Sequence, residues 1–169
     1  MSICHVNKLI FVHVPKNAGT SILNYFNSTP ESILPDQSWK EYSLFYDEWK
    51  YYTSFSIVRN PYSRFESFYK FLRIGSNINN VAKIVRDNNM ILTRPQHYYI
   101  YDNGKIMVDK LVRYENLDKE LSSIGICNLP RKNVSKTIPK DMLLMNQETI
   151  DIINTIYKRD FDIFNYEYR

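Results

Sequence analysis

The sequence predicts an α/β fold in which a small central parallel sheet is flanked by helices. Strand-like apolar runs at residues 8–14 and 54–58 are each followed by a polar turn and then by a helical pattern. A third strand-like run, at 106–112, again precedes a helical segment. Strands that alternate with helices in this way form parallel sheets. The length of 169 residues is that of one domain and suffices to bury a core, so residues 1–169 are predicted to form a single domain.

The first predicted strand, residues 8–14, is a β-branched and aromatic run typical of a strand covered on both faces, and Pro15 ends it. A helix is expected over residues 20–27. The stretch 28–52 is less regular and is expected to form loops.

A second strand, a capped helix and a further helix are predicted in the middle of the chain. After the strand 54–58, Asn60 is a good N-cap and Pro61 suits the first helical position, which indicates a helix over 61–72. A shorter helix is expected over 79–87.

In the last third of the chain, a strong turn signal at 102–104 (Asp-Asn-Gly) precedes the strand 106–112. A helix is expected over 115–124. A polar, basic loop at 128–140 leads to a last helix over 147–158, whose apolar residues recur on one face.

The turn between the first strand and first helix has the features of an anion-binding loop. Gly19 allows close approach of the backbone to a ligand, and Thr20 or Ser21 is expected to cap the following helix. Such a turn directs backbone N–H groups and the positive end of a helix dipole at one point. Lys16 precedes Gly19, whereas the loop of nucleotide triphosphatases places its lysine after the glycines.

A second strand-turn-helix motif, at residues 55–69, predicts another phosphate contact. Arg59 is expected at the carboxyl end of its strand, which is the ligand-facing edge of an open α/β sheet. A guanidinium suits a phosphate dianion because it donates two parallel, charge-assisted hydrogen bonds. Ser67 falls in the following helix and supplies a hydroxyl donor. Arg64 is expected to be a structural arginine that braces the helix.

These two motifs, in this order, resemble those of sulfotransferases that use 3′-phosphoadenosine 5′-phosphosulfate (PAPS). The resemblance extends through Pro95, Gln96 and residues 98–117, which follow the order seen in carbohydrate sulfotransferases. Residues 68–75 are similar to the corresponding stretch of uronosyl (heparan-type) 2-O-sulfotransferases. The C-terminal residues that also match the family pattern are Tyr157, Asp160, Phe161, Phe164 and Tyr166.

The resemblance implies a single-domain, P-loop-like three-layer fold and transfer of a sulfuryl group from PAPS to an acceptor hydroxyl, without a metal. It assigns Arg59 and Ser67 to the 3′-phosphate, and Lys136 to a loop that closes over the nucleotide. Lys16 would also stabilise the charge that develops on the departing 5′-phosphate. The residues that it assigns to the 5′-phosphosulfate loop are Lys16, Asn17, Ala18, Gly19, Thr20 and Ser21.

The general base is where the sequence departs from the family pattern, because no histidine lies between the two phosphate motifs. Glu41 is the candidate by its distance beyond the first loop, and His97, beside Gln96, is the rival. A structural histidine is an equally good interpretation of His97. His13, on the first strand, is expected to orient the loop rather than to transfer protons.

Two alternatives to a carbohydrate sulfotransferase stay open. One is a nucleotide or small-molecule kinase with an altered phosphate loop, although the chain lacks the GK[ST] signature. The other is a module that binds PAPS or its product, adenosine 3′,5′-bisphosphate, with little or no catalysis. The expected partner is a glycan or another small hydroxyl-bearing acceptor.

Composition restricts the other function classes. The net charge of +4 is modest, and the aromatic residues are not interleaved with a basic stripe, so nucleic-acid binding is not predicted. No apolar run is long enough to cross a membrane and no signal-peptide pattern is present, so a cytoplasmic protein is expected. The two cysteines, Cys4 and Cys127, match no metal or redox spacing.

Overall fold

A four-stranded sheet positions the candidate site. Its order is β1 (Ile3–Cys4), β2 (Leu9–Val12), β3 (Thr53–Val58) and β6 (Lys110–Arg113). Strand β1 is antiparallel to β2, whereas β2, β3 and β6 run parallel. Every residue of β2 is buried, as its apolar sequence predicts for a strand covered on both faces. The predicted α/β class with a mainly parallel central sheet is therefore confirmed.

The computed structural model describes residues 2–26, 38–45, 47–72, 75–88, 91–130 and 140–169. The chain divides into two compact units, each built from two separate stretches of sequence. The first unit comprises Met1–Arg59 and Gln96–Asn133, and contains the sheet. The second unit comprises Asn60–Pro95 and Val134–Arg169. That all 169 residues form one domain stays a prediction.

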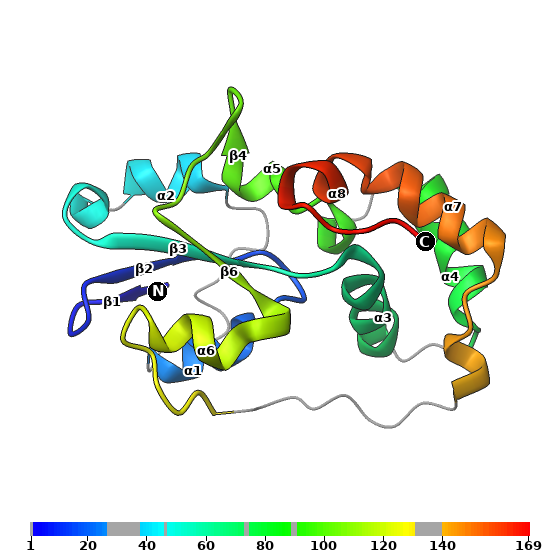
Figure 1. Cartoon of the computed structure of the whole chain (residues 1–169), viewed down its shortest axis with the longest axis horizontal. Coiled ribbons are helices and arrows are strands. Elements are labelled where there is room, and N and C mark those ends of the chain that lie inside the picture. The colour runs from blue at the N-terminus through cyan, green and yellow to red at the C-terminus, as the bar shows by residue number, and fades with distance from the viewer. Residues whose placement is uncertain (1, 27–37, 46, 73–74, 89–90, 131–139) are drawn as a thin grey trace. The chain divides into compact units, whose positions relative to one another are not determined.

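In the first unit, helices cover both faces of the sheet, which gives three layers (Figure 1). Helices α1 (Gly19–Tyr25) and α6 (Leu117–Ser122) lie on one side, and α2 (Trp39–Phe45) lies on the other. The core beneath α1 and α6 combines strand, helix and loop residues that are far apart in sequence. It consists of Leu9, Phe11, Ile22, Phe26, Phe55, Ile57, Val112, Leu121 and Ile126.

The shorter elements of the first unit are the 3-10 helices η2 (Asp47–Lys50) and η4 (Tyr114–Asn116), the helix α5 (His97–Ile100) and a hairpin. The hairpin joins β4 (Tyr101–Asp102) to β5 (Lys105–Ile106). Its turn contains Asn103 and Gly104, both with positive φ, as the Asp-Asn-Gly signal predicts.

The second unit is helical in the part of the chain that the structure describes. Its elements are α3 (Pro61–Leu72), α4 (Ile78–Asp87), η3 (Ile91–Thr93), η5 (Lys140–Leu143), α7 (Gln147–Ile156) and α8 (Lys158–Phe164). The predicted bounds of α3 are correct at both ends. Its start agrees with the capping signal, because Asn60 accepts a hydrogen bond from the Tyr62 amide at 3.0 Å and Pro61 is the first helical residue.

Arg64 has the structural role that its position in the second motif suggests. It is 3% exposed, and its guanidinium donates to the carbonyl oxygen of Arg94 at 2.9 Å. Its guanidinium carbon also lies 5.7 Å from the centre of the Tyr157 ring. Helix α3 is thereby tied to the segment that follows η3.

Several predicted elements differ from the structure in extent. The helix expected over 115–124 is η4 followed by α6, which ends at Ser122. The strand expected over 106–112 is two strands, because β5 pairs only with β4 and the sheet strand β6 begins at Lys110. The helix expected over 147–158 ends at Ile156, and α8 begins at Lys158. Tyr157 lies between them with φ −105° and ψ 18°, and its buried hydroxyl donates to the carbonyl of Thr93 at 2.8 Å.

No helix in the described ranges combines the length and the apolar character that a membrane span requires.

Candidate active site

The candidate site lies in the first unit, where three parallel strands end. The loop of residues 13–18 follows β2, Arg59 follows β3, and Tyr114 follows β6. Val58 at the end of β3 pairs in register with Arg113 at the end of β6. Ligands of open α/β sheets bind outside the carboxyl ends of the strands, so this edge is the expected place for a site.

The loop after β2 has an unusual backbone. Lys16 and Ala18 have positive φ values of 70° and 59°, which non-glycine residues rarely adopt. Strain of this kind is typical of functional sites. The carbonyl of Ala18 accepts the amide hydrogens of Ser21 and Ile22, at 3.0 and 3.2 Å. The amides that open α1 therefore lie at the end of this loop, and those of Gly19 and Thr20 have no partner within the helix.

The capping expectation for Thr20 or Ser21 is wrong. Helix α1 begins at Gly19 and its N-cap is Ala18, which makes no side-chain cap hydrogen bond with the residues that the structure describes. Thr20 and Ser21 both lie in the first turn, and Ser21 is buried. A side-chain cap would place an oxygen on one of the first amides of the helix, and the side chain of Ala18 has no oxygen to offer.

Position 19 needs a glycine because the side chain of His13 lies against it. A Cβ atom at residue 19 would lie 2.1 Å from Nε2 of His13, far inside contact distance. The imidazole of His13 occupies the space beside Gly19, and close approach of a ligand to this backbone stays a prediction. This contact agrees with the expectation that His13 orients the loop.

Arg59 is held from two sides. Its guanidinium carbon lies 4.0 Å from the centre of the Tyr114 ring, which is a cation–π contact. Its Nη1 donates to the carbonyl oxygen of Lys16 at 3.4 Å. Arg59 is partly exposed. The cationic residues of the two predicted phosphate motifs therefore belong to one edge of the sheet.

Two buried amides join these motifs, Asn17 and Gln96, and both are fully buried. The Nδ2 atom of Asn17 donates to Oε1 of Gln96 and to the carbonyl of Ile57, each at 2.7 Å. The side chain of Asn17 is therefore directed into the protein. The sequence identifies Gln96 only as part of the family resemblance and gives no contact for it.

Glu41 caps a helix. Its carboxylate accepts from the backbone amide of Ser38 at 2.7 Å and from the Ser38 hydroxyl. Ser38 and Glu41 have the spacing of a capping box at the start of α2. Partial burial raises the pKa of Glu41, but the hydrogen bonds from Ser38 and the charge of Lys40 outweigh it, so the pKa lies below its usual value. A lowered pKa makes Glu41 a weaker general base.

The other predicted site residues are placed as follows. His97 is the first residue of α5, is partly exposed and directly follows Gln96. Ser67 lies in α3 of the second unit and is partly exposed. Lys136 lies outside the described residues.

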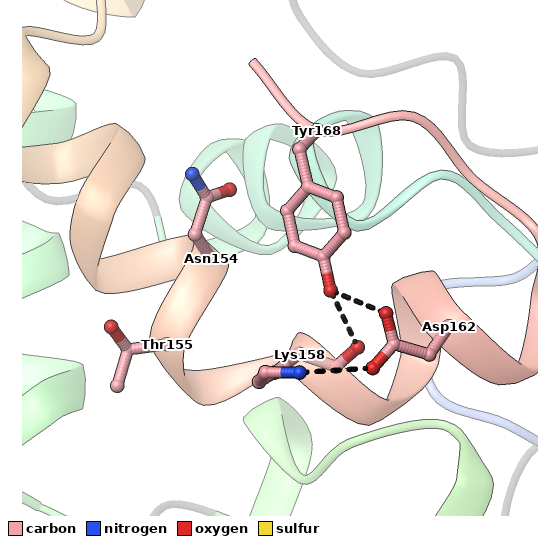
Figure 2. A pocket seen from close by; sticks show the side chains of 5 residues that line it. All are labelled: Asn154, Thr155, Lys158, Asp162 and Tyr168. Atoms are coloured by element: carbon pink, nitrogen blue, oxygen red, sulfur yellow. Dashed lines mark hydrogen bonds and ion pairs between the residues drawn. The ribbon is translucent and has the colours of Figure 1, made fainter.

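A pocket of about 420 Å³ in the second unit is lined by Asn154, Thr155, Lys158, Asp162 and Tyr168. Figure 2 shows the Tyr168 hydroxyl directed at Asp162 and at the backbone carbonyl of Lys158. The corresponding distances are 2.7 and 3.1 Å, and Lys158 Nζ lies 3.2 Å from the same carboxylate. These polar groups bind one another, so we interpret them as a structural contact that holds Tyr168 against α8.

Comparison with known proteins identifies the family. The family model described as "Sulfotransferase family" matches residues 1–167. No curated protein and no solved structure gives a significant match. This chain belongs to the sulfotransferase family, whose members are transferases that move a sulfuryl group to hydroxyl-bearing acceptors. The three-layer arrangement of the first unit is consistent with the fold of that family.

Proposed function

We propose that this protein transfers the sulfuryl group of PAPS to a hydroxyl of a carbohydrate acceptor and releases adenosine 3′,5′-bisphosphate. The observation that carries the proposal is the arrangement at the carboxyl edge of the sheet. There Arg59 donates to the carbonyl of Lys16 and so links the two phosphate motifs. Sulfotransferases generally use PAPS as their sulfate donor.

The donor site that we propose follows the two motifs. Lys16 and the amides of residues 17–21 receive the 5′-phosphosulfate, and Arg59 receives the 3′-phosphate. The cationic side chains and the first amides of α1 suit a polyanionic ligand. Ser67 and Lys136 are assigned to the nucleotide on the family resemblance alone.

In the proposed reaction, the bond between sulfur and the bridging oxygen of the 5′-phosphate breaks, and a bond between sulfur and the acceptor oxygen forms. Lys16 stabilises the negative charge that the 5′-phosphate gains as it leaves. A general base takes the proton of the acceptor hydroxyl. The loop and Arg59 keep the donor in line with the acceptor.

We propose His97 rather than Glu41 as that base. The carboxylate of Glu41 is engaged in the cap of α2, and its pKa is lowered. Histidine is the side chain that most often acts as a general base in enzymes. His97 directly follows Gln96, which contacts the backbone of Arg59.

The experiment that tests the proposal is transfer of labelled sulfate from PAPS to a panel of oligosaccharides, a small phenol and a tyrosine peptide. We expect labelled product with a carbohydrate. Arg59→Ala should abolish nucleotide binding, whereas Lys16→Ala should mainly lower kcat. Arg86→Ala is the matched control, because Arg86 is an exposed arginine that pairs with Asp87 and Glu148.

His97→Ala should lower kcat by about 10²-fold or more, the usual contribution of a general base. Glu41→Gln should leave kcat within a small factor of the unmodified enzyme. The opposite pattern would assign the base to Glu41. Binding of PAPS without transfer to any acceptor class would support a binding module in place of an enzyme, and normal nucleotide binding by Arg59→Ala would refute the site.

A further inference from the structure

The backbone of Arg59 is clamped by one side chain. Oε1 of Gln96 accepts the amide hydrogen of Arg59 at 2.9 Å, and Nε2 of Gln96 donates to the carbonyl of Arg59 at 2.8 Å. Gln96 thus pairs with both polar backbone groups of Arg59 just beyond β3. A side chain needs a donor and an acceptor at this spacing to do so, and an amide carries both without a change of protonation state.

The same glutamine oxygen binds the phosphosulfate loop. Nδ2 of Asn17 donates to Oε1 of Gln96 and to the carbonyl of Ile57, both at 2.7 Å. Asn17 stands between Lys16 and Ala18, the two loop residues with positive φ. The contact joins residues that are 79 positions apart in sequence. Both side chains are fully buried, so water does not compete for these bonds.

The side-chain amide of Asn17 is oriented so that both N–H bonds of its Nδ2 atom have acceptors. Its Oδ1 atom is buried and accepts no hydrogen bond from the residues that the structure describes. An unsatisfied buried acceptor is costly, and a structure that retains one needs a reason. The reason is that both hydrogens of Nδ2 find acceptors, one at the end of β3 and one on Gln96.

We propose that Asn17 and Gln96 are positioning residues that hold the Lys16 loop and Arg59 at a fixed spacing. This inference rests on the proposed function, in which the two segments bind the two phosphates of one nucleotide. The spacing of those phosphates is set by the nucleoside between them, so a preorganised pair of sites binds without the cost of ordering. Neither Asn17 nor Gln96 touches the reacting atoms through its side chain.

The test compares a ligand that needs the spacing with one that does not. Adenosine 3′,5′-bisphosphate occupies both segments, whereas adenosine 5′-monophosphate occupies only the loop. Gln96→Met keeps the side-chain length and removes the hydrogen bonds. We expect Gln96→Met to weaken bisphosphate binding by about tenfold and monophosphate binding by less than about twofold. Gln147→Met, at an exposed glutamine of α7, is the control and should change neither affinity.

Two double variants test whether Gln96 and Asn17 affect bisphosphate affinity through the contacts described above. In an Arg59→Lys background, which keeps a cation and therefore measurable binding, Gln96→Met should cause a smaller further loss of bisphosphate affinity than in the unmodified protein, because it acts through the side chain at position 59. Asn17→Ser combined with Gln96→Met should lose no more than the worse single variant, since both act through one oxygen. Equal weakening of both ligands by Gln96→Met, or additive losses in these cycles, would overturn the proposal.

A measurement without ligand separates this inference from the proposed function. The Arg59 amide hydrogen should exchange slowly with solvent in the unmodified protein and about tenfold or more faster in Asn17→Ser, while core amides of β2 stay unchanged. Asn17→Ser also serves if Gln96→Met does not fold. If the unmodified protein binds no bisphosphate, the proposed function fails, and exchange still decides whether the two segments are coupled. Unchanged exchange at Arg59 in Asn17→Ser would contradict the coupling.

Discussion

Gly19 illustrates, at the scale of single residues, how a loop sequence depends on a neighbour. Gly19→Ala places its Cβ against the His13 imidazole, and His13 or the loop must shift. We expect Gly19→Ala to destabilise the protein by about 1–3 kcal/mol, as overpacking does, and to weaken bisphosphate binding. Chemical denaturation and calorimetric titration measure the two effects.

A second substitution supplies the control for that prediction. His13→Ala removes the colliding ring, so the Gly19→Ala change should cost much less in the His13→Ala background. Equal costs in both backgrounds would mean that Gly19 is needed for another reason. Gly75, which has open space around it, is the matched glycine where alanine should meet no steric obstacle.

Tyr168 gives a prediction about pH. Its hydrogen bond to Asp162 raises the pKa of Tyr168 to about 12. The folded pKa is higher than the unfolded one, so this bond stabilises the fold fully below about pH 10 and loses that effect as pH rises through the folded pKa. In an absorbance titration, Tyr168→Phe should remove a late-ionising tyrosine from the 14 in the chain. Loss of an early-ionising tyrosine instead would contradict the assignment.

The sequence predicts some site residues and leaves others out for a physical reason. Lys16 and Arg59 are found because each directly follows a recognisable strand, and strand ends of a parallel sheet meet at one edge. The structure makes Asn17 a buried link rather than a side chain directed at a ligand. Its partner Gln96, and the stacking partner of Arg59, Tyr114, are distant in sequence, and no local pattern encodes such contacts.

At the scale of elements, helix α2 should depend on the Ser38–Glu41 cap. The lowered pKa of Glu41 means that this contribution is present above the unfolded pKa of about 4.3 and disappears as pH falls through the folded value. We expect Glu41→Ala to reduce the free energy of unfolding by about 1 kcal/mol at neutral pH, a typical cost of losing a cap.

Urea unfolding across a range of pH tests this expectation. The difference between the unmodified protein and Glu41→Ala should narrow below about pH 4. Glu41→Gln keeps an acceptor that does not titrate, so it serves as the control. The difference in free energy of unfolding between Glu41→Gln and Glu41→Ala should not change over the same pH range. A difference that persists unchanged in acid would show that the carboxylate charge is not involved.

Element boundaries were predictable where the signals are local. Helix α3 is correct because Asn60 and Pro61 define its start in the sequence itself. The helix predicted over 147–158 extends two residues past the end of α7, across the break at Tyr157, and α8 was not predicted. The hydrogen bond from Tyr157 to Thr93 links it to a segment 64 positions away. The strand predicted over 106–112 was also wrong in extent. Its first residue belongs to β5, which pairs with β4 in a hairpin, and the sheet strand β6 begins only at Lys110.

At the scale of the whole molecule, we expect the two units to unfold together, as the single-domain prediction requires. Each unit consists of two separate stretches, so neither forms from one continuous part of the chain. Both tryptophans, Trp39 and Trp49, belong to the first unit, whereas the second unit is helical in its described ranges. Tryptophan fluorescence and far-ultraviolet circular dichroism therefore weight the two units differently.

Coincident urea transitions by these two probes would indicate one cooperative domain. A fluorescence transition that is displaced from the dichroism transition would show that the units unfold independently. The same measurement with saturating bisphosphate should move both transitions to higher urea if ligand binding stabilises one cooperative structure.

The central claim is that the edge formed by the Lys16 loop and Arg59 is a donor site for PAPS. Calorimetric titration of the purified protein with adenosine 3′,5′-bisphosphate and, separately, with ATP plus Mg²⁺ tests it most directly. We predict tight binding of the bisphosphate and little response to ATP. Binding of ATP without binding of the bisphosphate would contradict the assigned donor site and favour a kinase-like nucleotide site.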